Sequence, residues 1–471
     1  MPQMTGGPAS TPGAGRARGA GGAGGEPPAT SAVPEPRGER PAEHHLRLKL
    51  IIPAAAVLVV VVLVALFLVP SRTDEPSHLA SARGSTTTAA RSSTAVTGST
   101  VVSGSSAPGG TTTSKPPPTT TKPAVPPLGT QPASITLLFA GDLLPHTPLT
   151  AQAARYGQAT HRPFDFDPML APMKPIISGA DVAICHMETP VAPDQGHLSG
   201  YPAFGGPVEL VDAARSAGYD GCSNASNHSL DRGQDGIRAT LDRFDLDHLH
   251  HAGTARTAAE AAAITMYDVR NVRVAHLSYA YDFNGYRLPA GAPWAANKID
   301  PAKIKADAAK AKALGADLVV VSVHWGTEYD SNPNQYQRDM AAAMLQSPDI
   351  DLVIGCHAHV VQPIDQVAGR FVVWGMGNQL ANQPEVPRSD GLTAIATAIK
   401  DPATGKWKVA GVQGVPTWIE PGTFHVYPVV RTLADPSTSP ALRNQLNASY
   451  DRSAATILRD HTPGVTVTPK P

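Results

Sequence analysis

Histidines and acidic residues recur in this sequence directly after short apolar runs, and these side chains are the usual ligands of divalent metal ions in proteins. The clearest example is the segment 352–362, in which His357 and His359 follow the run Leu-Val-Ile-Gly. Two imidazoles one residue apart can reach different coordination positions of a metal pair, and we expect Gly355 to let the backbone turn there. Taken alone, the pair fits ordinary loop histidines better than a metal site.

Similar clusters follow other predicted strands, and together they favour a metal site. They are Asp142 and His146 after 135–140, Glu188 after 181–185, Asn227 and His228 in the loop 223–233, and His324 after 317–323. The sheets of α/β proteins present functional side chains at the carboxyl ends of their strands. Carboxylate, carboxamide and imidazole groups from separate strand ends, with one carboxylate shared, suit a pair of divalent cations. Five loops of this kind are hard to explain as chance.

The remaining periodic segments predict an alternation of helices and strands. Apolar periodicity indicates helices at 208–217, 236–244, 301–314 and 335–346, and a further strand at 271–278. After Asn378 we expect paired strands at 392–399, 407–412 and 424–430 that complete a second sheet, with turns at Pro416 and Pro421-Gly422. Four other histidines fit surface or core positions better than ligand positions: His248, His250, His251 and His276.

The first part of the chain has a different composition. Of the 471 residues 46 are Pro and 42 are Gly, and these two types and Ser/Thr are concentrated before residue 134, so the folded part must be smaller than the chain. Residues 1–49 have few large apolar side chains and are predicted to be disordered. Residues 50–69 are uncharged, overwhelmingly apolar and long enough to cross a bilayer. A cleaved signal peptide is the alternative, but its leader and apolar core would be unusually long.

The charges beside this apolar segment predict its orientation. Arg40, Arg47 and Lys49 precede it, whereas Arg72 behind it is offset by two acidic residues. The positive-inside rule therefore predicts a single-pass protein of the cell membrane with a cytoplasmic N-terminus and an extracytoplasmic main domain. Residues 70–133 are rich in Ser, Thr and Pro and predict a stalk, 134–430 the folded domain, and 431–471 a polar C-terminal tail with a short helical stretch near 440–459.

Taken together, the motifs resemble the CapA-type capsule biosynthesis proteins, a family linked to poly-gamma-glutamate and placed in the calcineurin-like metallophosphoesterase superfamily. The similarity runs from Ile135 to Pro428. It rests on the order and spacing of Gly141-Asp142, Glu188-Thr189-Pro190, Asn227-His228-Ser229-Leu230-Asp231 with Gly233, His324-Trp325-Gly326 with Glu328-Tyr329, Gly355 with His357 and His359, and Gly377-Asn378. The sequence departs from the family pattern at His186-Met187, Ser226, Cys356 and Gln379, where Asn-Leu, Asn, His and Phe are usual.

The resemblance implies an α/β fold of the α+β type, a four-layer α/β/β/α metallophosphoesterase-like sandwich tethered here to the single N-terminal transmembrane helix. It also implies two divalent ions, which would be manganese, iron or zinc. One ion would be held by Asp142, His146, Glu188 and His359, and the other by Glu188, Asn227, His324 and His357. His146 lies farther from Asp142 than the superfamily spacing. His228 would remain off the metals as the catalytic general acid, or as the residue that orients the attacking water.

Three classes of function are compatible with these features. They are a metal-dependent hydrolase acting on a phosphoester or anionic polymer, a non-catalytic accessory subunit of a polymer synthase or exporter, and an amide hydrolase or transferase acting on gamma-glutamyl polymer. The expected partners are the membrane and other polymer-synthase subunits. A formal net charge of -1 gives no electrostatic reason to expect nucleic acid as a partner.

The sequence has three cysteines, so at most one internal disulfide can form. Cys185 and Cys222 end strands that lead to the same edge, and they could pair. Cys356 would then remain a thiol beside the metals.

Overall fold

The computed structural model describes residues 132–471. The predicted disordered segment 1–49, the predicted membrane span 50–69 and nearly all of the predicted stalk 70–133 lie outside the described residues. In the part of the chain that is described, no helix combines the length and the apolar character needed to cross a bilayer.

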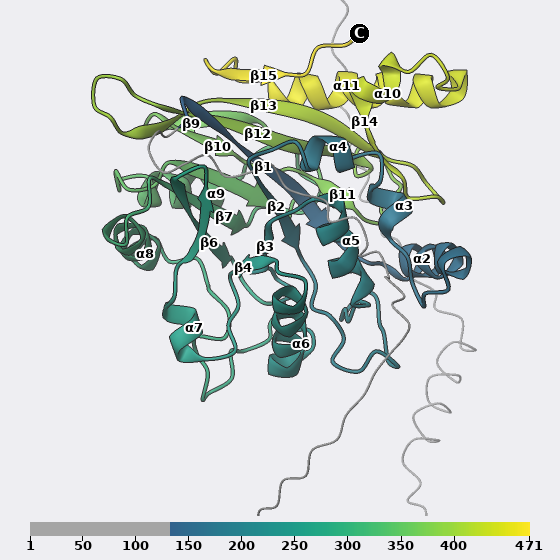
Figure 1. The fold of residues 1–471 in the computed structure, drawn as a ribbon, viewed down its shortest axis with the longest axis horizontal. Coiled ribbons are helices and arrows are strands. Elements are labelled where there is room, and N and C mark those ends of the chain that lie inside the picture. The colour runs from purple at the N-terminus through teal and green to yellow at the C-terminus, as the bar shows by residue number, and fades with distance from the viewer. Residues whose placement is uncertain (1–131) are drawn as a thin grey trace, which may run out of the picture. The chain divides into compact units, whose positions relative to one another are not determined.

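Residues 132–471 form two mixed β-sheets, one of nine strands and one of six (Figure 1). The larger sheet has the order β14-β13-β12-β1-β2-β3-β4, with β11 also paired to β1 and β15 to β13. Its strands are β1 (Ser134–Leu143), β2 (Val182–Met187), β3 (Gly221–Ser223), β4 (His250–Ala252), β11 (Asn378–Leu380), β12 (Asp390–Lys400), β13 (Trp407–Ile419), β14 (Val426–Pro428) and β15 (Val465–Val467). The smaller sheet has the order β5-β6-β7-β8-β10-β9. Its strands are β5 (Thr265–Val269), β6 (Val272–Ala280), β7 (Leu318–His324), β8 (Leu352–Cys356), β9 (Ile364–Val367) and β10 (Arg370–Val373).

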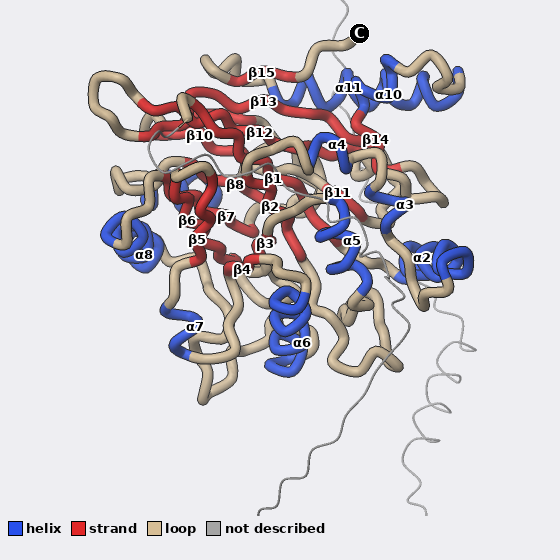
Figure 2. The backbone as a smooth tube through the Cα atoms, in the orientation of Figure 1, coloured by secondary structure: helices blue, strands red, loops and turns tan. Residues whose placement is uncertain are grey.

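The two sheets face each other across an apolar layer, and helices cover their outer faces (Figure 2). The layer between the sheets combines side chains such as Leu137 and Ile184 from the larger sheet with Val320 and Ile354 from the smaller one. Helices α2 (Thr147–Thr160), α3 (Asp167–Leu170), α4 (Lys174–Ile177), α5 (Glu209–Ala217) and α6 (Gly233–Leu246) pack against the larger sheet. Helices α8 (Pro301–Ala313) and α9 (Gln335–Met344) pack against the smaller one. The described chain is therefore a mixed α/β fold in four layers; a short helix, α7 (Ala258–Ala262), lies between β4 and β5.

The C-terminal segment packs onto the larger sheet. Helix α10 (Val429–Ala434) and helix α11 (Pro440–Ile457) lie along β13, and β15 pairs with β13 in parallel (Figure 1). Leu446 and Ile457 of α11 are fully buried. The helical stretch that we expected near 440–459 is thus present as α11. The segment 431–471, which we predicted to be a polar tail, is folded against the domain.

The strands expected after Asn378 do form, but they join the larger sheet beside β1 instead of completing the other one. Pro416, expected in a turn, lies inside β13 opposite Leu392. The backbone N–H of Leu392 points away from Pro416 and donates to the backbone oxygen of Met376, so no hydrogen bond joins Leu392 and Pro416. The N–H that proline lacks is therefore not needed at this position. On its other edge β13 pairs with β15 up to Gly414 and with β14 from Thr417. Pro416 therefore falls in the gap between these two partners.

Candidate metal centre

The side chains singled out in the sequence meet where several parallel strands end. Asp142 lies near the end of β1 and Glu188 directly follows β2, which pairs with β1 in parallel. His324 ends β7, and His357 and His359 follow β8, its parallel neighbour. Because the carboxyl ends of the two sheets adjoin here, these five side chains come together, and each is buried.

The backbone turn after β8 is made by the histidines themselves. Gly355, which we expected to provide the turn, lies within β8, and a Cβ at this position would stand 2.0 Å from the backbone oxygen of Trp374. Glycine is therefore required there for the close approach of another strand. His357 and His359 have φ angles of 95° and 54°. These left-handed conformations are uncommon for residues other than glycine, and such strain is often found at functional sites.

Glu188 occupies the middle of the candidate centre. It forms one group of potential ligands with His324 and His357, and another with Asp142 and His359; within each group the ligand atoms lie within 4.8 Å of one another. Oε1 of Glu188 is 3.8 Å from Nε2 of His324 and 3.7 Å from Nε2 of His359. A carboxylate shared by two groups in this way can bridge two cations.

Asn227 lies beside the first of these groups. Its Oδ1 is 2.8 Å from Nε2 of His324, which places a carboxamide oxygen next to the imidazole nitrogen. The structure thus brings together six of the seven residues for which the sequence predicts a metal-binding role. They are Asp142, Glu188, Asn227, His324, His357 and His359.

Several of these atoms are buried without a hydrogen-bond partner among the described residues. They are Oδ1 of Asp142, both carboxylate oxygens of Glu188 and Nδ1 of His357. An unpaired buried carboxylate is strongly unfavourable, because its charge is removed from water without compensation. A cation bound between the carboxylates and imidazoles would supply the missing partner. The donor set of oxygen and imidazole nitrogen therefore fits divalent metal ions.

The protonation tendencies of Glu188, His324 and His357 agree with this fit, whereas the charges of Glu188 and Asp142 outweigh burial at His359 and raise its pKa to about 10. Burial raises the pKa of Glu188, so the carboxylate does not hold its charge easily without a cation. Burial lowers the pKa of His324 well below its ordinary value and that of His357 to about 3, and neighbouring histidines lower both further. Neutral imidazoles keep the lone pair that a metal ligand needs.

His146 is the predicted ligand that the structure does not bring into these groups. It precedes α2, its ring packs edge-on against Phe204 with centroids 5.4 Å apart, and its Nδ1 accepts a hydrogen bond of 3.2 Å from the backbone of Asn382. None of the ligand groups found in residues 132–471 includes it. In the sequence, the long spacing between Asp142 and His146 is the feature that agrees with a position outside the ligand groups.

His228 is also outside the ligand groups of the described residues, although it lies next to Asn227. Its Nδ1 is 2.7 Å from Oδ2 of Asp231, and both side chains are buried. Burial lowers the pKa of His228, but the hydrogen bond to Asp231 and the charge of Glu188 outweigh it, so the pKa is raised. An imidazole held through Nδ1 by a carboxylate has its Nε2 free for proton transfer.

The structure also adds potential ligands that the sequence argument did not name as such. His186 and Cys356 form a buried group with Asp142, and the exposed Glu328 forms one with His357 and His359. Their sequence signals were their positions, since His186 precedes Glu188 by two residues and Cys356 precedes His357. Burial and the nearby carboxylates raise the pKa of the Cys356 thiol well above its usual range, so it remains protonated.

Arg388 had no sequence signal, because it comes from a loop far along the chain. Its guanidinium lies 3.7 Å over the ring of Tyr329, and that ring stacks on His359 with centroids 6.0 Å apart. The backbone oxygen of Arg388 accepts a hydrogen bond from Asn378, whose Oδ1 lies 2.9 Å from Nδ1 of His359. The side chain of Asn378 thus contacts both the candidate ligand His359 and the loop that carries Arg388.

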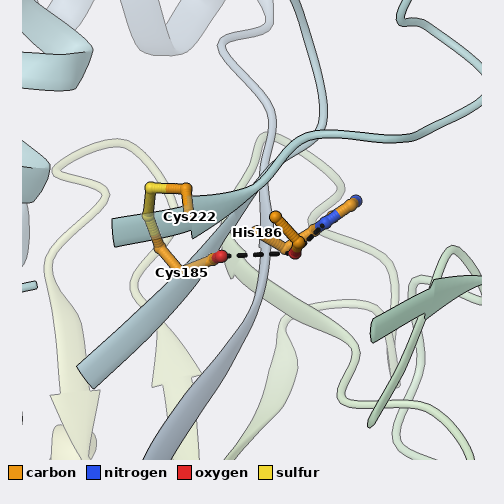
Figure 3. The surroundings of a disulfide bond; sticks show 4 residues. Cys185, His186 and Cys222 are labelled. Atoms are coloured by element: carbon orange, nitrogen blue, oxygen red, sulfur yellow. Dashed lines mark hydrogen bonds between the residues drawn. A yellow bond between two sulfur atoms is a disulfide. The ribbon is translucent and has the colours of Figure 1, made fainter. Parts of the chain in front are cut away.

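The disulfide that the sequence allowed is present between Cys185 and Cys222 (Figure 3). These two residues face each other on the parallel strands β2 and β3, at the positions just before His186 and Ser223. Cys356 is the free cysteine of the described residues, and it is buried.

Comparison with known proteins agrees with the motifs. The family model described as "Bacterial capsule synthesis protein PGA_cap" matches residues 136–383. The chain is 25% identical over 312 residues to the PGA biosynthesis protein CapA of Bacillus subtilis, covering 64% of this chain and 77% of that protein. It is 27% identical over 262 residues to the capsule biosynthesis protein CapA of Bacillus anthracis, covering 53% and 60%.

Two further similarities are weaker. A protein of Mycobacterium tuberculosis, named for an accessory role in polyglutamine synthesis, is 26% identical over 252 residues, covering 48% of this chain and 64% of that protein. Among solved structures, the NAD nucleotidase NadN of Haemophilus influenzae aligns with a TM-score of 0.37 and 8% identity over 72% of this chain and 64% of that one. A likeness at that level carries no argument about this protein.

Proposed function

The chain belongs to the bacterial capsule synthesis protein family PGA_cap, and from this premise we propose that it acts as a metal-dependent hydrolase in the assembly or export of an envelope polymer of the poly-gamma-glutamate type. The observation that carries the proposal is Glu188, a fully buried carboxylate with no partner for either oxygen among the described residues. It lies between imidazoles from both sides of the site. The facing sheets, with these residues at their carboxyl ends, support a fold of the calcineurin-like metallophosphoesterase type.

In this proposal Glu188 would be shared by two divalent ions, one held also by Asp142 and His359 and the other also by Asn227, His324 and His357. Bound cations supply the positive charge that polarises a phosphoryl or acyl oxygen and neutralises the charge that builds up during hydrolysis. The buried surroundings keep bulk water away from these groups and so strengthen their electrostatic effect. The ions would be manganese, iron or zinc.

His228 is the residue we assign to proton transfer. Asp231 accepts its Nδ1–H and fixes the ring, which leaves Nε2 to protonate the leaving oxygen or nitrogen, or to orient the attacking water. The guanidinium of Arg388 lies over Tyr329 and 3.3 Å from Oε2 of Glu385, so this positive charge beside the site is already paired. No basic cluster in the sequence marks a phosphate pocket, which weakens the case for a phosphoester substrate.

The test uses the full-length protein, purified and analysed for metals by mass spectrometry, and then assayed on an aryl phosphodiester and on a gamma-glutamyl peptide. We expect bound transition metal, and hydrolysis that a chelator abolishes and added metal restores. A protein that binds no manganese, iron or zinc even after reconstitution would refute the metal centre. Inactivity on both substrates, with polymer production in cells still dependent on Glu188 and His357, would favour the accessory role in a synthase complex.

We further propose that the domain lies outside the cell membrane, held by the apolar segment 50–69 through the stalk 70–133. The support is the charge asymmetry around that segment. Protease added to intact cells should remove a tag from the C-terminus and leave one at the N-terminus intact. Protection of the C-terminal tag would refute this location and the envelope role that depends on it.

A further inference from the structure

His186 lies directly behind the candidate metal centre, and both of its ring nitrogens have partners. Nε2 is 2.9 Å from Nδ1 of His324, and Nδ1 is 2.8 Å from Oγ of Ser223. The side chain is only 2% exposed, so no water competes for these contacts. His186 therefore contacts one proposed ligand, His324, and its Nε2 lies 3.8 Å from Oδ1 of another, Asp142.

The last partner in this series determines the direction of the hydrogen bonds. The hydroxyl of Ser223 donates to the backbone oxygen of Cys185 at 3.3 Å. A hydroxyl has one hydrogen and a carbonyl oxygen can only accept, so with this hydrogen on the Cys185 carbonyl, Oγ of Ser223 accepts from Nδ1–H of His186. The neutral His186 ring then has its lone pair on Nε2, where it accepts the Nδ1–H of His324.

This direction leaves the lone pair of His324 on Nε2, the atom that faces Asn227 and Glu188. Nε2 is 2.8 Å from Oδ1 of Asn227, which is also an acceptor. Two lone pairs at this distance repel each other unless a cation lies between them. The opposite direction of the series would put a proton on Nε2 of His324, satisfying Asn227 and blocking the atom that a metal ion needs.

The strands and the disulfide hold this series in place. Cys185 pairs in register with Cys222, and His186 pairs in register with Ser223 on the parallel strands β2 and β3. The disulfide therefore ties the two strands one residue before the contact between His186 and Ser223 (Figure 3). The backbone pairing therefore fixes the positions of His186, Ser223 and the Cys185 carbonyl oxygen.

We propose that His186, through Ser223 and the Cys185 carbonyl, is a positioning residue that fixes the tautomer and orientation of His324 for metal binding. This role rests on the metal centre proposed above. Ligand histidines commonly donate their second N–H to such a partner, and losing that partner weakens metal affinity by about 10- to 100-fold. The partner here is another histidine, at a position where the related family usually has asparagine.

The first experiment measures zinc affinity of the full-length protein by competition with a chromophoric chelator. We expect His186→Leu to bind zinc about 10- to 100-fold more weakly than the wild type. His186→Gln, whose side-chain oxygen can accept the N–H of His324, should recover most of the lost affinity. The matched control is His276→Leu, because His276 is also a buried histidine bonded to a serine, Ser322, but it has no bond to a proposed ligand. This control should bind zinc like the wild type.

The second experiment needs no substitution, so it remains informative if a variant fails to fold. The ring nitrogens of the zinc-loaded wild type are observed by 15N NMR after selective histidine labelling. We expect a proton on Nδ1 and metal on Nε2 for His324. For His186 we expect a proton on Nδ1 and an unprotonated, metal-free Nε2.

Distinct outcomes would overturn the two proposals. A wild type that binds none of zinc, manganese and iron would refute the metal centre itself. Normal zinc binding in the wild type, with equal affinities for His186→Leu and His276→Leu, would refute the positioning role alone. Metal on Nε2 of His186 would instead make His186 itself a ligand, in the group that it forms with Asp142 and Cys356.

Discussion

Two carboxylates of the larger sheet are almost completely buried, and they differ in what neutralises them. Asp390 begins β12 and receives two hydrogen bonds from Arg452 of α11, at 2.7 and 2.9 Å. Glu188 follows β2 in the candidate metal centre, and neither of its oxygens has a hydrogen-bond partner among the described residues. Arg452 donates hydrogen bonds to one buried acid, whereas the other has only imidazoles at 3.7 and 3.8 Å and no hydrogen bond.

The comparison separates a structural acid from a candidate functional one. A paired buried acid fixes two elements against each other, here α11 and the start of β12. An unpaired one costs stability, so it is retained for a role that the folded chain alone does not fulfil. The following substitutions test either the region of the candidate metal centre or the Asp390–Arg452 pair. Their effects should decrease in the order given.

Glu188→Gln should have the largest effect. The neutral amide cannot hold two adjacent divalent ions together, since they repel strongly without a shared anion. We expect the metal content to fall to background and hydrolysis to disappear, as measured by mass spectrometry and by turnover of the two substrates. The metal-free variant should fold at least as stably as metal-free wild type, because an amide is less costly to bury than a carboxylate. Full metal retention would contradict the bridging role.

The second prediction concerns the disulfide, a covalent bond that joins β2 and β3 beside the candidate metal centre. Replacing both Cys185 and Cys222 with Ala removes a cross-link that closes a loop of 37 residues. The chain-entropy relation gives a loss of about 4 kcal/mol in the free energy of unfolding. Urea denaturation of the oxidised wild type and the double variant measures this difference, and a reduced wild type serves as the control. Equal stability of oxidised and reduced wild type would show that the bond contributes nothing.

His228→Asn tests whether the site region separates metal binding from catalysis. The residue is held by Asp231 and lies outside the ligand groups, so its loss should leave the metal content and the fold unchanged. Turnover should fall by about a hundredfold or more, the usual scale for a positioned acid or base. Loss of metal equal to that of Glu188→Gln would instead identify His228 as a ligand.

The sequence predicted the site better than it predicted the sheets. Strand-end positions of Asp142, Glu188, His324, His357 and His359 are visible locally, because an apolar run followed by a polar ligand is a short-range pattern. The parallel pairing of the strands then brings them together. His146 was the exception: its spacing from Asp142 is longer than that of the superfamily, and the position of its side chain depends on a loop conformation that the sequence alone does not determine.

Contacts between distant segments were not predictable in this way. The addition of β12 and β13 to the sheet of β1, and the packing of α11 onto them, depend on pairings across many residues. Arg452 and Arg388 illustrate the same limit. Each is an ordinary charged residue in the sequence and acquires its role only through Asp390 and Tyr329, which lie far from it along the chain.

Asp390→Asn should have the smallest effect and tests the structural side of the contrast. Arg452 keeps about a third of its side chain exposed, so its charge returns to water when the carboxylate is lost. Losing the charged hydrogen bonds should therefore lower the free energy of unfolding by only about 2 kcal/mol, as measured by urea denaturation. Arg452→Met should cost more, about 3 kcal/mol, because it leaves the Asp390 carboxylate buried and unpaired. Both variants should bind metal like the wild type, and a loss of metal in either would show that the two regions are coupled.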